Sequence, residues 1–371
     1  MTTNQSWAVA GPVPPAGTKA LDLAKPGPSL FVKAMPLETL DNVRAALQKA
    51  IELEHATLPV YLQAAYSLDD AKNGQIAGMI IGVAMQEMEH FCQACNILVA
   101  IGGSPAIDDP AFVPTYPGGL PEGIGTQPGQ PEFIVHLRGF SKDQVKTCFM
   151  VIEEPADPVD IQDAGRLVAA SDIAANYQTI GEFYEAIASA LTTLCETQSI
   201  FSGTAAGQVY GMFDIKPILD LTSALDAINR IVVEGEGTPT SPEEPDDATM
   251  AHYYTYYEIY KGRSITRKDD GWYFTDPAIP FDPNGVANII DDPKQSDYAD
   301  GSAAAIQSQA FNTYYSNLLK ALHASFNGQP DRINEAIGLM FDLKIQAKLL
   351  MNTPMPDGSG KFAAPTWQYV P

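Results

Sequence analysis

Glutamates and a histidine interrupt the apolar stripes of two predicted helices. Glu54 lies in the first stripe, and Glu87 and His90 lie in the second as Glu-x-x-His. A buried carboxylate without a partner is costly, so such a position indicates a group that is paired or bound to metal. The i, i+3 spacing places Glu87 and His90 on one helix face, where both can reach one ion. The pattern indicates a metal site of carboxylates and imidazole.

Four-helix bundles build dinuclear sites from a lone glutamate on two helices and Glu-x-x-His on the other two. For the third helix we expect Glu182 as the lone glutamate, with Glu185 as the alternative. The apolar period does not decide between them, because both lie off the main apolar stripe. The fourth helix has no Glu-x-x-His. Instead, Glu234 and Glu236 precede its break and His252 follows an inserted loop, so the choice between these two glutamates stays open.

Each of these residues also has a purely structural explanation. Glu54 could pair with a lysine or arginine, and His90 on its own would be an ordinary core histidine. Glu234 and Glu236 could be solvated at a helix end, and His252 could pack in the tyrosine cluster of residues 253–257. In this case the protein is a structural bundle that binds no metal.

The elements that position these residues follow from the spacing of apolar side chains. Helices are predicted over about 43–61, 74–102, 172–201, 219–233, 248–261, 302–326 and 331–351, with a hairpin near 268–272. Cys92 and Cys95 point roughly 80–140° away from Glu87 on the second helix and are expected to be small apolar fillers. The predicted fold class is therefore all-α.

Composition narrows the classes of function. The chain has 371 residues, of which 45% are hydrophobic and 18% charged, and its net charge is -23. Such an acidic surface repels phosphate backbones and anionic lipid, so nucleic-acid and membrane-surface roles are not expected. The sequence shows no secretory signal, no apolar run of roughly 20 residues and only four cysteines, so we expect a cytoplasmic protein.

The motifs resemble a known family when they are taken together. Ile51-Glu52-Leu53-Glu54-His55, Glu87-Met88-Glu89-His90, Ile180-Gly181-Glu182-Phe183-Tyr184, Val233-Glu234-Gly235-Glu236 and His252-Tyr253 resemble the ferritin-like family typified by iminophenyl-pyruvate dimer synthases of violacein- and rebeccamycin-type pathways. The resemblance covers roughly residues 36–262. It implies a ferritin-like four-helix bundle with long connecting loops and additional C-terminal helices.

The expected organisation is a single domain in three parts. Residues 1–35 form an extended N-terminal arm, residues 36–262 form the ferritin-like bundle with inserted loops, and residues 263–371 form an irregular segment with a C-terminal helical pair packed on the bundle. Exposed apolar faces of bundles often pair, which is compatible with a homo-oligomer.

The expected cofactors are two metal ions, with iron first and manganese as the alternative, because both accept carboxylate and imidazole ligands. Glu54, Glu87 and His90 would hold one ion. Glu182, His252 and one of Glu234 and Glu236 would hold the other, with Glu87 as the bridge. Tyr61, Tyr184 and Tyr256 are candidates for roles next to the ligands or in the pocket.

Two catalytic functions are consistent with such a site. The first is an oxidoreductase acting on a small organic, amino-acid-derived substrate. The second is a ferroxidase or peroxide-detoxifying protein that handles iron without an organic substrate. The long loops at 103–172 and 237–300 favour the first function, because a simple ferroxidase bundle needs little beyond four helices.

Overall fold

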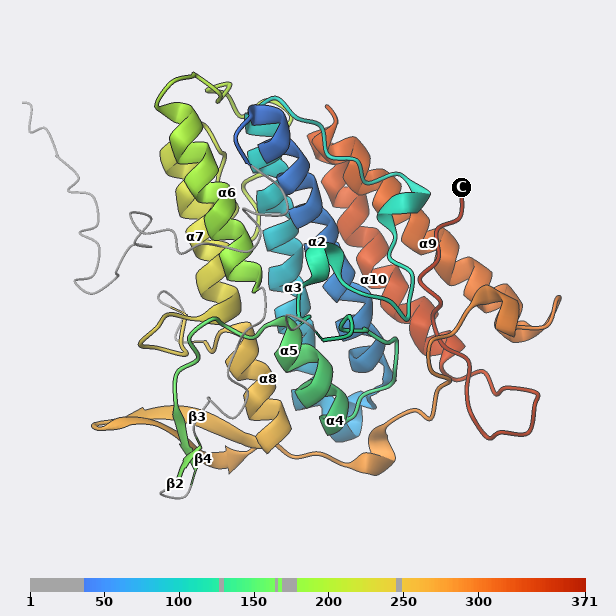
Figure 1. The fold of residues 1–371 in the computed structure, drawn as a ribbon. Helices are drawn as coiled ribbons and strands as arrows, with labels where there is room; N and C mark the ends of the chain where they lie inside the picture. Colours follow the sequence, from blue (N-terminus) through green and yellow to red (C-terminus); the bar gives the residue numbers. More distant parts are fainter. Residues whose placement is uncertain (1–36, 127–129, 164–165, 169–178, 245–248) are drawn as a thin grey trace, which may run out of the picture.

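Four long helices stand side by side and form the body of the molecule (Figure 1). They are α2 (Leu40–Ser67), α3 (Asp70–Ala100), α6 (Ile180–Cys195) and α7 (Leu221–Glu236). The computed structural model describes residues 37–126, 130–163, 166–168, 179–244 and 249–371. The predicted arm over 1–35 lies outside these residues. The predicted bundle and its mostly helical class are confirmed.

The two longest helices of the bundle, α2 and α3, both begin at a capping side chain. Thr39 caps α2 by accepting a hydrogen bond from the Asn42 backbone N–H at 3.2 Å. Asp69 caps α3 by accepting from the Ala71 N–H at 2.9 Å. The helix α3 ends at Ala100, and Gly102 follows with a φ of +74°, a conformation that glycine adopts without strain.

The helices α6 and α7 differ from the predicted ranges at their ends. The helix α6 begins at Ile180 after a capping box of Thr179 and Glu182, and ends at Cys195 rather than Phe201. Residues 172–178 of the predicted helix lie outside the described residues. The helix α7 continues through Glu236, so the predicted break at 234–237 falls only at Gly237, whose φ is +78°. Both glutamates are therefore helical.

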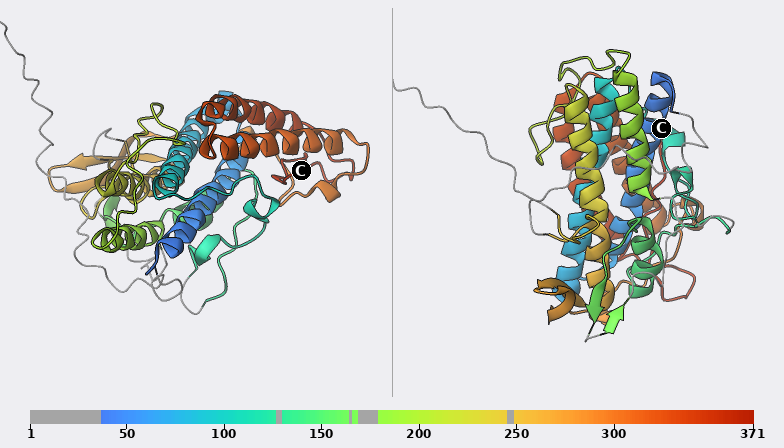
Figure 2. Two further views of the ribbon diagram at one scale, coloured as in Figure 1. Left: turned by 90° about the horizontal axis from the view of Figure 1, so that it is seen from above. Right: turned by 60° about the vertical axis from the view of Figure 1, so that its left-hand side comes forward.

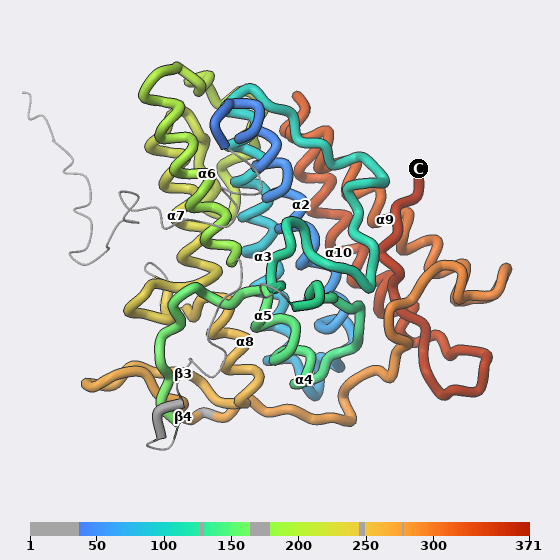
Figure 3. The backbone as a smooth tube through the Cα atoms, in the orientation of Figure 1, coloured from blue at the N-terminus to red at the C-terminus, as the bar shows by residue number. Residues whose placement is uncertain are grey.

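Two short helical segments cover one end of the bundle. The first comprises α4 (Lys142–Gln144), a π-helical turn (Val145–Phe149) and α5 (Met150–Ile152), and it packs along α8 (His252–Lys261). The ring centroid of Tyr256 on α8 lies 5.1 Å from those of both Phe149 and Tyr61. This aromatic cluster joins α8 to α2. Figure 3 shows α8 directly below the end of α7.

The C-terminal helices α9 (Ala303–Phe326) and α10 (Ile333–Leu350) form a pair along the flank of α2 and α3 (Figure 2). The Tyr315 hydroxyl lies 2.7 Å from His55 Nε2, and the Trp367 indole N–H donates to Gln63 at 3.1 Å. The outer face of α10 exposes Phe341, Ile345 and Leu349. A homo-oligomer through this face stays a prediction.

A small sheet and several single turns complete the described fold. The strand order is β2 (Arg166–Val168), β1 (Ile161–Asp163), β4 (Gly271–Ala278), β3 (Arg263–Lys268). The antiparallel pair β3 and β4 closes with Lys268 opposite Gly271, which confirms the predicted hairpin. Short 3₁₀ turns lie at Pro110–Phe112, Pro121–Gly123, Pro283–Gly285, Gln295–Asp297 and Pro330–Arg332. None of the described helices is long and apolar enough to cross a membrane.

The link between α8 and the hairpin should make stability depend on pH. Glu258 is buried and accepts a hydrogen bond from the Ile265 N–H at 2.5 Å, and burial raises its pKa to about 7. The folded protein thus keeps a proton that the unfolded chain releases at lower pH, so this stabilisation is lost as pH rises from about 4.5 through 7. Glu258→Gln removes the titrating group but keeps the acceptor.

We therefore expect the difference in unfolding free energy, wild type minus E258Q, to fall by about 2 kcal/mol between pH 5 and pH 8. Chemical denaturation across this pH range measures it. Parallel profiles for the two proteins would contradict the assignment.

Candidate metal centre

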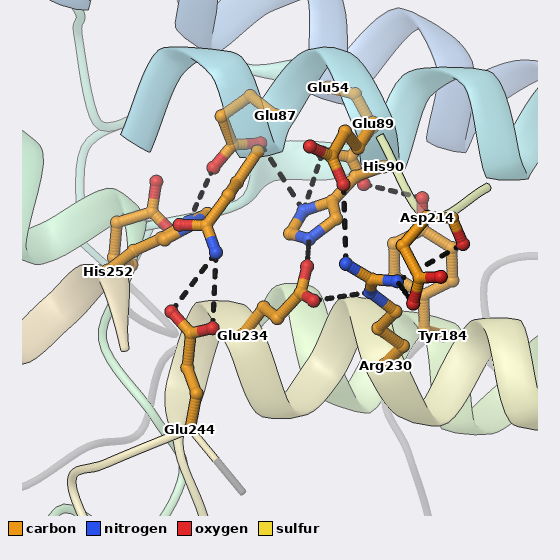
Figure 4. Close-up of polar contacts among 12 residues, drawn as sticks. Glu54, Glu87, Glu89, His90, Tyr184, Asp214, Arg230, Glu234, Glu244 and His252 are labelled. Atoms are coloured by element: carbon orange, nitrogen blue, oxygen red, sulfur yellow. Dashed lines mark hydrogen bonds and ion pairs between the residues drawn. The ribbon is translucent and has the colours of Figure 1, made fainter. Parts of the chain in front are cut away.

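Two helices bring three side chains that could hold a metal ion to one point inside the protein. Glu87 and His90 project from α3, and His252 projects from the first turn of α8. Each offers one ligand atom, and these atoms lie within 4.8 Å of one another. All three residues are buried, and Figure 4 shows Glu87 lying between the two imidazoles.

Two further carboxylates face the same point. Glu54 of α2 lies 4.0 Å from His90 Nδ1, and Glu153, directly after α5, lies 3.5 Å from His252 Nδ1. Glu54 and Glu153 line a small cavity of about 10 Å³ together with Glu87, His90 and Glu236. A cavity of this size holds a single water-sized group.

His90 turns one ring nitrogen towards the cluster and the other away from it. Its Nδ1 faces Glu54 and Glu87, while its Nε2 lies 2.8 Å from Glu234 Oε2. The other Glu234 oxygen accepts from Arg230 Nε, and Arg230 also contacts Glu89 at 3.3 Å (Figure 4). The carboxylate of Glu234 therefore holds the Nε2 proton of His90, which leaves Nδ1 free to bind a cation.

Glu234 and Glu236 face different neighbours because residues two apart on a helix point about 200° from each other. Glu236 turns to the start of α6, where its Oε1 accepts from the Gly181 N–H at 2.6 Å. A side chain at Gly181 would fall 2.6 Å from this carboxylate. Burial raises the pKa of Glu236 to about 8. The helix end thus places Glu236 on the cavity wall and Glu234 behind His90.

The structure does not bring Glu182 to the cluster. Its carboxylate accepts a hydrogen bond from the Thr179 N–H at 3.2 Å, as the reciprocal half of the capping box. Glu185 is exposed. The position that faces Glu54 from α6 is instead Tyr184, whose hydroxyl donates to Glu54 Oε1 at 2.5 Å. The Thr-x-x-Glu pattern at 179–182 was the available signal for the cap.

The other two candidate tyrosines lie against the opposite side of the cluster. Tyr61 donates its hydroxyl to Glu153 Oε1. The Tyr256 hydroxyl is buried and has no hydrogen-bond partner among the described residues. Burial and the nearby carboxylate Glu153 raise the pKa of both phenols, so both stay protonated near neutral pH.

At this buried point the carboxylates outnumber the histidines that pair with them. In the part of the chain that the structure describes, the ion pairs of Glu54, Glu87 and Glu153 are with His90 and His252 only. Burial and the neighbouring Glu87 carboxylate raise the pKa of Glu54 well above its usual value. Burial opposes protonation of His252, but the Glu87 and Glu153 carboxylates outweigh it and raise its pKa.

The donor geometry fits a bound metal ion. His252 Nδ1 lies 2.8 Å from Glu87 Oε1, yet this buried nitrogen makes no hydrogen bond of acceptable geometry within the described structure. Ligand atoms of this kind, a ring nitrogen and a carboxylate oxygen that approach each other without a hydrogen bond, can both bind one cation. Carboxylates with imidazoles suit iron or manganese.

Glu153 is the residue of this cluster that the sequence analysis missed. It follows the apolar run Met150–Ile152 and stands beside a second glutamate, Glu154. No periodic stripe marks it. Cys92 and Cys95, by contrast, are free and buried, as expected of small apolar fillers.

Comparison with known proteins gives the same fold and extends it to a family. A model of the ferritin-like family matches residues 47–261. A ferritin-like protein from Caulobacter vibrioides has a solved structure with a TM-score of 0.58 and 21% identity, which covers 90% of this chain and 99% of that chain. This likeness shows the fold.

A curated relative is similarly distant in sequence. Dichlorochromopyrrolate synthase of Lentzea aerocolonigenes is 23% identical over an alignment of 394 residues that covers 92% of this chain. The chain spans only 37% of that relative's length. The family match covers more than half of the chain and includes both histidines and all the glutamates of the cluster. The chain belongs to the ferritin-like family.

Proposed function

We propose that this protein is a metal-dependent oxidoreductase with a dinuclear iron or manganese centre and a small organic substrate. The observation that carries the proposal is the convergence of Glu87, His90 and His252 at one buried point with surplus negative charge around it. Bound iron or manganese would supply the redox chemistry.

The proposed ligands number four carboxylates and two imidazoles. They are Glu54, Glu87, Glu153, Glu236, His90 and His252. This is the donor composition of dinuclear centres in ferritin-like bundles. The proposal replaces Glu182 by Glu153 and prefers Glu236 to Glu234, because Glu234 already bonds to His90 and Arg230.

The surrounding residues orient these donors and keep the site dry. Tyr184 and Tyr61 each donate a hydroxyl hydrogen bond to one carboxylate oxygen, which leaves the other oxygen of that carboxylate for a cation. Ile180, Ile231 and Val232 line the cavity and exclude water. A dry, pre-arranged site avoids reorganisation when charge changes on the ions.

An organic substrate is supported by two features. The relative from Lentzea aerocolonigenes is named as a synthase of an organic compound. The long segments before α6 and after α7 also exceed what four helices need. An amino-acid-derived substrate is the class that we propose, as the family resemblance implies.

A second candidate function is iron oxidation or peroxide removal without an organic substrate. The volume of the central cavity favours it, because about 10 Å³ admits a water-sized reactant but no organic molecule. Under the first proposal the substrate must react at the cavity wall, where Gly181 and Gly235 leave little side-chain bulk.

Ligand variants test the metal site. Glu87→Ala, His90→Ala and His252→Ala should each weaken metal binding by at least about tenfold, because each removes a donor that no neighbour can replace. Titration of the metal-free protein with Mn²⁺ measures the affinity. Cys92→Ala on the same helix is the control and should bind as the wild type does. Wild-type affinity in all three ligand variants would contradict the site.

The two glutamates at the end of α7 should differ in their effect. Glu236→Gln should remove about one metal ion per chain, since it removes a proposed ligand. Glu234→Gln should keep the number of ions, since it changes only the group behind His90. Equal loss of metal in both variants would mean that the helix end, and not one carboxylate, matters.

Oxygen uptake separates the two candidate functions. Dioxygen consumption by the reduced, metal-loaded protein should rise severalfold in the presence of the right compound from a panel of amino-acid-derived imines and indoles. The His90→Ala protein should show no rise. Uptake that depends on ferrous iron alone, across the whole panel, would favour the ferroxidase function.

A further inference from the structure

The loop between α7 and α8 reaches back to His252 through a glutamine of α3. The Gln86 side chain places its Oε1 at 3.2 Å from His252 Nε2. Its Nε2 lies 3.1 Å and 3.2 Å from the two oxygens of Glu244, a buried residue of that loop. Three side chains thus form one chain of contacts, from the loop to the imidazole.

The donor and acceptor rules fix the direction of this line. An ionised carboxylate only accepts hydrogen bonds, so Glu244 must receive the amide N–H groups of Gln86. The amide oxygen of Gln86 must then face His252. An oxygen acceptor at Nε2 requires that Nε2 carries a proton, so Nδ1, which faces Glu87 and Glu153, is the nitrogen that exchanges its proton for a cation.

A reversed amide would have the opposite consequence. If the Gln86 NH₂ group faced His252, Nε2 would become the acceptor and Nδ1 would carry the proton. A protonated Nδ1 cannot bind a cation. Among the described residues, Glu244 is the partner that holds the Gln86 amide against this reversal.

The imidazole is held from both sides by consecutive residues of α3. Gln86 contacts Nε2 of His252, and Glu87 lies 2.8 Å from its Nδ1. His90, on the same helix, is held differently, since its Nε2 contacts a carboxylate that Arg230 neutralises. The two histidines therefore reach the same tautomer by different means.

We propose that Glu244 and Gln86 are positioning residues that set the metal-binding tautomer of His252. Through them the inserted loop orients His252, which supplies the imidazole that a Glu-x-x-His motif on the fourth helix would otherwise have supplied. This inference rests on the proposed metal centre. The position three residues after Glu234, where a Glu-x-x-His motif would place its histidine, is Gly237, and α7 ends there. His252 therefore comes from beyond the loop.

Exchange of the two side chains is the sharpest test. Gln86→Glu alone keeps an oxygen acceptor at His252 Nε2, so this variant should retain metal within about threefold of the wild type. Glu244→Gln alone gives an amide that can present either end, so this variant should lose metal about 10- to 100-fold faster than the wild type. The double variant Q86E/E244Q restores an acceptor at His252 and a donor next to it, so its rate should return to within about threefold of wild type.

The measurement is the loss of Mn²⁺ from loaded full-length protein to excess EDTA, followed by elemental analysis after desalting. Glu243→Gln on the same loop is the matched control and should retain metal as the wild type does. Thermal unfolding of the metal-free variants checks that all of them fold. A role in anchoring the loop alone would instead lower the thermal stability of the metal-free Glu244→Gln protein.

The outcomes separate the two proposals. Wild-type retention in the Glu244→Gln variant, or a double variant no better than that single one, would overturn the role of Glu244 and Gln86 while the metal centre stands. A wild type that binds no Mn²⁺ or Fe²⁺ would overturn the metal centre itself, and this inference with it.

Discussion

An excess of carboxylates at the buried centre of the bundle is the electrostatic requirement that the surrounding side chains must meet. Glu54, Glu87 and Glu153 are each almost fully buried, and the only ion-pair partners of these three that the described residues provide are His90 and His252. Removing such charges from water is expensive, and proton uptake or a bound cation must compensate. The raised pKa of Glu54 is the metal-free form of that compensation.

The fold is arranged around this centre. The helix α3 supplies Glu87 and His90 on its inner face and Gln86 and Glu89 on the flanks, so one helix contacts almost every part of the site. The helix α7 contributes through its last turn, where Glu234 contacts His90 and Glu236 accepts a hydrogen bond from the Gly181 N–H. Tyrosines from α2 and α6 fill the space that further ligands would occupy and donate to the carboxylates.

Sequence periodicity was sufficient for the parts of the site that lie in long apolar stripes. A polar residue at a 3–4 spacing is conspicuous among isoleucines and alanines, which is why Glu54, Glu87 and His90 could be singled out. The i, i+3 relation of Glu87 and His90 needs only helix geometry. Both residues are buried and adjacent in the structure.

Periodicity failed where the backbone leaves a regular helix. Glu153 follows a short segment with a π-helical turn, and nothing local separates it from Glu154. Glu182 has the residue type of a ligand, but Thr179 lies three positions before it and the capping box uses its carboxylate. The contacts of Gln86 with Glu244 and His252 join residues 158 and 166 positions apart, which no local pattern reveals.

The central claim is that the buried carboxylates and histidines hold metal. Elemental analysis of the wild-type protein, produced with iron and manganese available, tests it most directly. We expect about two iron or manganese atoms per chain, since the four carboxylates and two imidazoles have the composition of a dinuclear centre. A protein that contains no metal, even after reconstitution with either ion, would contradict it and leave a bundle whose buried carboxylates are protonated.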